Sequence, residues 1–226
     1  MKTQIKYYKE LKSYCLKEGA DLFGVADISN IKEDFNLSQE ITKNLDKAIS
    51  IGVRLSHQVF KDITDKPTKL YFHHYRVANM FLDQLSFKIS NWIQRRNALA
   101  LPIPASQIVD WENQKAHLSH KKIAVLAGLG WIGRNNLLVN PRLGARLRLA
   151  TILTNLSIAT NKPLQRDCGE CRLCIDACPV GAIHEKSQDF DHLGCFEKLK
   201  EFQKKNIVGQ YICGICVKVC APQNSK

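Results

Sequence analysis

Eight of the nine cysteines lie beyond residue 167, in two spaced runs that are suited to binding iron. The runs are Cys168-x2-Cys171-x2-Cys174-x3-Cys178, with Pro179 after it, and Cys195 with Cys213-x2-Cys216-x3-Cys220. The first run has the spacing of bacterial ferredoxins, in which three thiolates bind one [4Fe–4S] cluster and the fourth binds the other. The pattern therefore predicts two clusters in this part of the chain.

The usual ferredoxin crossover assigns every one of these cysteines to a cluster. The first set is Cys168, Cys171, Cys174 and Cys220, and the second set is Cys178, Cys195, Cys213 and Cys216. Two zinc sites would more naturally show two separated CxxC pairs each. Disulfides fit poorly with a chain that has no secretory signal.

The charge of the chain is one-sided. Its formal net charge is +12, and two clusters of charge about −2 each would lower this to roughly +8. No acidic residue lies between Glu112 and Asp167, while lysines and arginines recur throughout that stretch. This favours an anionic ligand, a partner or a nucleic acid such as tRNA, with a plain solvated surface as the alternative.

Cysteine placement predicts two domains, because residues 1–160 contain only Cys15. The expected fold class is α+β, with an α/β domain over residues 1–160 and a ferredoxin-like two-cluster domain over 161–226. Apolar spacing predicts helices over 3–18, 70–96 and 115–127. Buried inner strands are expected at 21–26 and 47–54, and an edge strand at 98–104.

A β-hairpin is expected after the third helix, with arms at 137–139 and 145–154 and a turn at 140–144. In its second arm Arg146 and Arg148 alternate with leucines, so we expect the two arginines to share one face.

The run Gly128-x-Gly130-x-x-Gly133 matches the dinucleotide-binding pattern. That fingerprint needs a strand before it and an acidic residue about twenty residues after it. The chain has no acid there until Asp167, so a nicotinamide or flavin site is disfavoured, although an arginine could take a 2′-phosphate.

Asp110 is the candidate proton donor, because it lies in a loop and a reductase must obtain protons near its electrons. A surface or capping aspartate is the alternative. The remaining α/β part implies a redox cofactor or substrate site, since electron transfer alone would need only the ferredoxin part.

The N-terminus has no signal-peptide core, and no run of eighteen apolar residues occurs in the chain. We therefore expect a cytoplasmic protein with no membrane partner.

Several segments in the same order resemble the epoxyqueuosine reductase family, which is related to the corrinoid reductive dehalogenases. They are Asp21-Leu-Phe-Gly-Val-Ala26, Ala48-Ile-Ser-Ile-Gly52, Tyr75-Arg76, Ala127-Gly-Leu-Gly-Trp-Ile-Gly-Arg-Asn135, Leu137-Leu-Val-Asn-Pro141 and the two cysteine runs. The resemblance covers most of the chain and corresponds to a short form without the C-terminal helical-repeat region.

The resemblance implies a nitroreductase-like α/β domain that holds a base-off cobalamin, with the clusters reducing its cobalt. The residues expected against this cofactor are Gly128, Gly130, Trp131, Gly133, Arg134, Arg146 and Arg148. Asp110 would then be the proton donor in deoxygenation of a tRNA epoxide, and a ferredoxin or flavodoxin would supply electrons.

The alternative hypothesis assigns the chain to a different functional class. The chain would then be a non-catalytic electron-transfer or corrinoid-activating iron–sulfur protein, whose α/β domain docks the cofactor of a partner.

Overall fold

The computed structural model describes residues 1–221, and residues 222–226, at the end of the predicted second domain, lie outside it. The chain forms two compact units that interleave along the sequence. The first comprises Met1–Val53, Asn79–Leu129 and Arg148–Leu164; the second comprises Arg54–Ala78, Gly130–Leu147 and the chain from Gln165 onward. A single boundary near residue 160 did not anticipate this interleaving, and that boundary stays a prediction.

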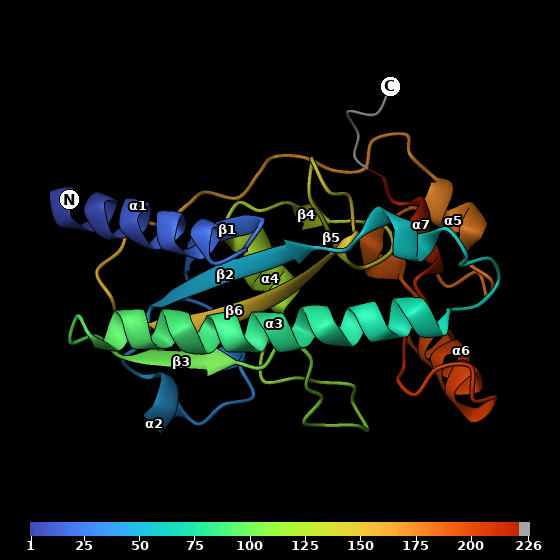
Figure 1. Ribbon diagram of the computed structural model, residues 1–226, viewed down its shortest axis with the longest axis horizontal. Helices are drawn as coiled ribbons and strands as arrows, with labels where there is room; N and C mark the ends of the chain where they lie inside the picture. The colour runs from blue at the N-terminus through green and yellow to red at the C-terminus, as the bar shows by residue number, and fades with distance from the viewer. Residues whose placement is uncertain (222–226) are drawn as a thin grey trace. The chain divides into compact units, whose positions relative to one another are not determined.

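The first unit is built on a four-stranded sheet in the order β1-β2-β6-β3 (Figure 1). Its strands are β1 (Leu22–Asp27), β2 (Lys47–Arg54), β3 (Ala100–Ile103) and β6 (Leu147–Thr154), the last beginning at the unit boundary. Its helices are α1 (Lys2–Lys17), η1 (Lys32–Asp34), α2 (Gln39–Thr42), α4 (His120–Leu126) and most of α3 (Lys69–Gln94). The helices and strands expected for the first hundred residues are thus confirmed within one or two residues.

The β1 strand lies at one end of the sheet, so the expectation that it is an inner strand was wrong. It pairs antiparallel with β2 from Leu22↔Gly52 to Asp27↔Lys47, yet five of its six residues are buried. Asn161 takes the place of a further strand: its side chain accepts from the Val25 N–H at 2.9 Å, and its own N–H donates to the Val25 carbonyl at 2.7 Å. A polar side chain and a loop therefore cover an edge whose pattern resembles that of an inner strand.

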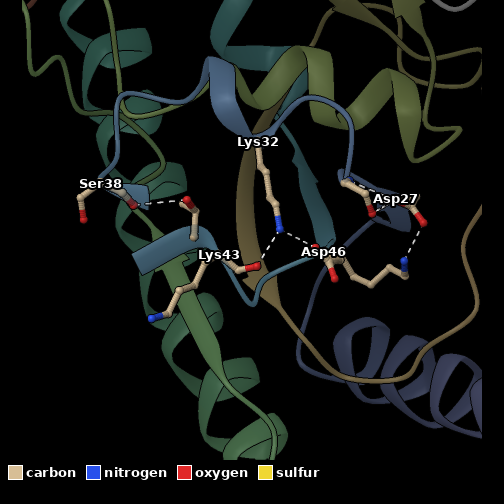
Figure 2. Close-up of polar contacts among 8 residues, drawn as sticks. Asp27, Lys32, Ser38, Lys43 and Asp46 are labelled. Carbon is tan, nitrogen blue, oxygen red and sulfur yellow. Dashed lines mark hydrogen bonds and ion pairs between the residues drawn. The ribbon is translucent and has the colours of Figure 1, made fainter. Parts of the chain in front are cut away.

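Charged side chains fix the connection between β1 and β2 (Figure 2). The ammonium group of Lys32 donates to the Lys43 carbonyl at 2.8 Å and to Asp46 Oδ1 at 2.6 Å. Lys47, at the start of β2, donates to Asp27 Oδ2 at 2.6 Å, and this hydrogen bond, together with two from Ser29, lowers the pKa of the Asp27 carboxyl to about 2. The long polar connection is held to the start of the next strand.

The helix expected over 115–127 begins five residues later, at His120. Asp110 and Lys115 pair through their backbones in a turn, and the Ser119 side chain then caps the helix by accepting from the Lys122 N–H. His117 therefore precedes α4 and does not lie within it.

The second unit holds short elements and all eight of the clustered cysteines. The elements of the second unit are η2 (His57–Phe60), the start of α3, β4 (Trp131–Ile132), β5 (Leu138–Val139), α5 (Leu173–Ala177), η3 (Ser187–Asp189), α6 (His192–Lys204) and α7 (Ile215–Val219). The expected hairpin between 137–139 and 145–154 was wrong, because β5 pairs with β4 and β6 joins the larger sheet. The side chain of Asn140 accepts from the N–H groups of Arg142 and Leu143, which closes a local turn.

No helix within residues 1–221 combines the length and the apolar character that crossing a membrane requires.

Candidate functional site

The cysteines of the second unit fall into two groups of neighbours. In the first group, burial and, to a smaller extent, charges on Cys174, Cys168 and Cys171 raise the pKa of the Cys220 thiol to about 11. Burial, with Cys168 and Cys171 nearby, also raises the pKa of Cys174. These four are the set that the crossover assigns to the first cluster.

The second group consists of Cys178, Cys195, Cys213 and Cys216, whose thiols likewise affect one another's pKa. Burial raises the pKa of Cys213 to about 11, with Cys195 and Cys178 as further causes. Burial raises the pKa of Cys216 as well, and Cys213, Cys195, Cys174 and Cys178 contribute to this shift. The pKa of Cys216 is thus affected by cysteines of both groups. This agrees with the packing of α7, which carries Cys216, against α5, which carries Cys174.

The donor chemistry of these groups fits [4Fe–4S] clusters, since each group supplies four thiols. No three His, Cys, Asp or Glu side chains among residues 1–221 meet at the spacing of a single bound ion. The assignment of individual ligands stays a prediction that rests on the grouping of the thiols.

N–H groups surround the sulfur atoms. The indole Nε1 of Trp131 donates to Cys168 Sγ at 3.4 Å. Backbone N–H groups of Ala145 and Ile215 donate to Cys220 and Cys213, and each of these bonds lowers the pKa of its thiol. Such bonds stabilise negative charge on sulfur, as a metal-bound thiolate requires.

Arg134 holds the loop that contains the first two cysteines. Its two terminal nitrogens donate to the carbonyl oxygens of Cys171 and Gly169, each at 2.9 Å. Its Nε donates to Glu185 Oε2 at 3.2 Å, and only 16% of the side chain is exposed. Arg134 was expected against a corrin; its donors are directed at the cysteine loop, and the corrin contact stays a prediction.

Arg146 is engaged within the same unit. Its guanidinium contacts His57 Nδ1 at 2.7 Å, donates to the Lys218 carbonyl in α7 and lies over the Phe60 ring. Burial lowers its pKa, while the nearby Cys220 acts to raise it. Arg146 therefore positions the helix that leads into Cys220.

Two glycines of the GxGxxG run lie in the second unit and are required for close packing. A β-carbon on Gly130 would lie 2.1 Å from the Val139 carbonyl oxygen, and one on Gly133 would lie 2.5 Å from Val139 Cγ2. The α4 helix precedes the run and the short strand β4 lies within it, so the strand-before and helix-after order of a dinucleotide site is not present. The arrangement agrees with the argument against a nicotinamide or flavin fingerprint.

The other predicted site residues lie in the first unit. Gly128 adopts a φ of +71° beside the Lys162 carbonyl. Arg148 Nε donates to Asn79 Oδ1 at 2.8 Å, and its Nη2 donates to the Ala105 carbonyl at 3.4 Å. Arg146 precedes β6 and Arg148 lies within it, and the face that they were expected to share stays a prediction.

Asp110 is a partly exposed residue at the start of a turn, where its backbone pairs with that of Lys115. Its Oδ1 accepts from the Asn113 backbone N–H at 2.9 Å, and its Oδ2 accepts from the Asn113 side chain at 2.8 Å. These hydrogen bonds lower the pKa of the carboxyl. The geometry is that of a capping carboxylate in its ionised form, and its role as proton donor stays a prediction.

Sequence reasoning missed the buried side chain of Asn135, which is 3% exposed and directly follows Arg134. Its signal was its place in the same short segment as Trp131 and Gly133. It also missed the bond between Trp131 and Cys168, which depends on a contact across 37 residues.

Comparison with known proteins agrees with this site. Residues 167–224 match the 4Fe-4S double cluster binding domain. The chain is therefore a two-cluster iron–sulfur protein of mixed helix and sheet, which confirms the predicted fold class.

Relatives define the class more narrowly. The epoxyqueuosine reductase of Leadbetterella byssophila is 26% identical over 247 residues, covering 97% of this chain and 80% of that protein. The enzyme of Bacillus cereus is 33% identical over 115 residues, which is 47% of this chain and 30% of that protein. Over most of its length the chain is similar to epoxyqueuosine reductases, as the sequence motifs predicted.

Solved structures share the fold. Epoxyqueuosine reductase from Streptococcus thermophilus has a TM-score of 0.63 at 21% identity, over 96% of this chain and 66% of that one. The catabolic reductive dehalogenase NpRdhA has a TM-score of 0.76 at 18% identity, over 96% of this chain and 32% of that one.

Proposed function

We propose that this protein is an oxidoreductase whose two [4Fe–4S] clusters pass electrons to a cobalamin that reduces a substrate. The observation that carries the proposal is the division of eight cysteines into two groups of four within the double cluster domain. The fold adds support, because it is shared with a reductive dehalogenase described as B12-dependent, at a TM-score of 0.67. Iron–sulfur ligation by free thiols suits a reducing compartment, and we place the protein in the cytoplasm.

The support for cobalamin comes from the fold and not from the predicted arginines. The donors of Arg134 and Arg146 bind groups of the cysteine unit, and Arg148 binds Asn79 and Ala105. Any corrin in this conformation would need backbone groups or other side chains. When bound, cobalamin would supply a low-valent cobalt, which is a strong reductant.

A tRNA-borne substrate is the proposed substrate class. An epoxyqueuosine reductase has been crystallised with an epoxyqueuosine-modified tRNA stem loop, and this chain shares its fold at a TM-score of 0.64. The net charge of +12 and the acid-free stretch after Glu112 would favour a polyanion. Binding to the tRNA stem loop should then weaken steeply as salt is raised, with a slope set by the phosphates contacted.

The test begins with anaerobic titration of the cluster-reconstituted protein with cobalamin, followed by electron paramagnetic resonance of the Co(II) state. A stoichiometric base-off signal is expected. Two intact clusters without binding at micromolar cobalamin would overturn the enzyme proposal.

The geometry of Asp110 favours the second candidate, a non-catalytic electron-transfer protein that docks a partner. An ionised, exposed carboxylate is not a ready acid. Asp110→Asn separates the candidates when compared with Glu112→Gln, a matched change at a neighbouring exposed acid. Turnover lost only in Asp110→Asn, with cluster reduction intact, supports the enzyme; turnover retained in both variants removes Asp110 as the proton donor.

A further inference from the structure

A buried amide without a hydrogen-bond acceptor lies beside the first cysteine group. Asn135 is 3% exposed, and its Nδ2 has no hydrogen-bond partner within the described part of the chain. Leaving a buried N–H group unsatisfied costs about 1–3 kcal/mol. Native proteins seldom keep such a group unless a bound ligand, ion or water accepts a hydrogen bond from it.

The orientation of this amide is set by its neighbour. Asn135 Oδ1 accepts from the Leu137 N–H at 3.3 Å. Exchanging the oxygen and nitrogen would bring two donors face to face, so the carbonyl belongs toward Leu137. The NH₂ group is therefore the free end of the side chain.

The side chains of Asn135 and Cys168 both border Gly133. A β-carbon on Gly133 would lie 3.0 Å from Asn135 Oδ1 and 3.5 Å from Cys168 Sγ, so both atoms surround the space that the glycine leaves open. The same sulfur accepts from Trp131 Nε1 at 3.4 Å. Trp131 is only 4% exposed and packs with Val139 and Ala145 against Cys168 and Cys220.

We propose that Trp131 and Asn135 act together as positioning residues that raise the reduction potential of the first cluster. The Trp131 indole donates to the Cys168 thiolate, and the Asn135 amide donates to a sulfur at that corner of the bound cluster. This inference rests on the proposed two-cluster electron path and assigns a direction to it.

The physical reason is the charge of the two redox states. Reduction adds one electron from a low-potential donor to the cluster, and no bond is formed or broken. N–H dipoles directed at sulfur stabilise the more negative, reduced form, and hydrogen bonds to sulfur are among the factors that set cluster potentials. The first cluster is thereby favoured as the electron acceptor.

The experiment uses the full chain reconstituted with iron and sulfide. Trp131→Phe keeps a buried ring without the N–H group, and Asn135→Leu keeps a branched side chain without the amide. Matched controls are Trp111→Phe and Asn44→Leu, because both positions are exposed and belong to the other unit. Dithionite titrations followed by electron paramagnetic resonance give the potential of each cluster.

Each of the two site substitutions should lower the reduction equilibrium constant of one cluster about tenfold, which is about 59 mV for a one-electron couple. The other cluster should stay unchanged and serves as an internal reference, as do both controls. If all variants hold two clusters and neither site substitution shifts a potential, the proposal is refuted.

Iron content separates this outcome from failure of the proposed function. Wild-type protein with clearly fewer than about eight irons per chain would overturn the two-cluster assignment itself. A second measurement needs no substitution: electron–nuclear double resonance on wild-type protein reconstituted in D₂O. Three strongly coupled exchangeable hydrogens at the reduced first cluster, from Trp131, Asn135 and the Ala145 N–H that donates to Cys220, support the proposal. Fewer than three overturn it even if a variant fails to assemble.

Discussion

Gly144 is the position where a single added carbon should cost the protein a cluster. Its φ is +60°, and a β-carbon there would lie 2.1 Å from the Cys220 carbonyl oxygen and 2.9 Å from the Cys220 carbonyl carbon. Both atoms belong to the backbone, so no flexible side chain can move aside. Gly144→Ala must therefore displace Cys220, a predicted ligand of the first cluster.

The magnitude has two parts, and one glycine of the same unit isolates the first. An alanine in the left-handed region costs about 1–2 kcal/mol. Gly181 has a φ of +63° with no atom within 4 Å of its would-be β-carbon, so Gly181→Ala should show this cost alone. Gly144→Ala adds overpacking of about 1–3 kcal/mol or more.

The assay is iron and sulfide content after anaerobic reconstitution, with the rate of iron loss to a chelator. Gly181→Ala should retain about eight irons, whereas Gly144→Ala should retain about four, since only the first cluster loses a ligand. Equal iron content and equal rates in the two variants would refute the packing argument.

Three further outcomes are expected. Arg134→Gln should speed loss of one cluster to chelator several-fold, because the cysteine loop loses its two charge-assisted bonds, while exposed Arg142→Gln should not. Burial lowers the pKa of His120 to about 4, so on acidification the unfolded chain binds a proton at this residue at a higher pH than the folded chain does. The free energy of unfolding should therefore fall by up to roughly 3 kcal/mol between pH 6.5 and pH 4. Denaturant titrations should show that His120→Gln weakens this pH dependence. Asn161→Ala should lower the unfolding free energy by about 1–3 kcal/mol through the unpaired Val25 N–H, with Asn44→Ala as an inert control.

Local patterns predicted much of the chain. The α3 helix was predictable because apolar residues recur three or four apart from Tyr71 to Ile93, and β2 because a continuous apolar run is typical of a buried strand. The presence of two clusters was also predictable, since the cysteine spacing is that of bacterial ferredoxins; the assignment of each cysteine to a cluster stays a prediction.

What failed depended on contacts between distant residues. The hairpin prediction paired β5 with the segment that follows it, whereas the packing of Gly130 against Val139 selects β4 as its partner. The corrin contacts of Arg134 and Arg146 were implied by the family resemblance and stay predictions. Their partners are carbonyl oxygens at Gly169, Cys171 and Lys218, which no sequence pattern marks.

The two ends of the four-stranded sheet bear on how this protein avoids self-association. Exposed strand edges are templates for another chain and promote aggregation. At β1 the Val25 N–H and carbonyl are both occupied by Asn161, and at β3 Pro102 has no N–H to offer. The β1 edge is thus protected by tertiary structure, and this protection exists only once Asn161 has bound to Val25. The β3 edge is protected by its own sequence, which does not depend on folding.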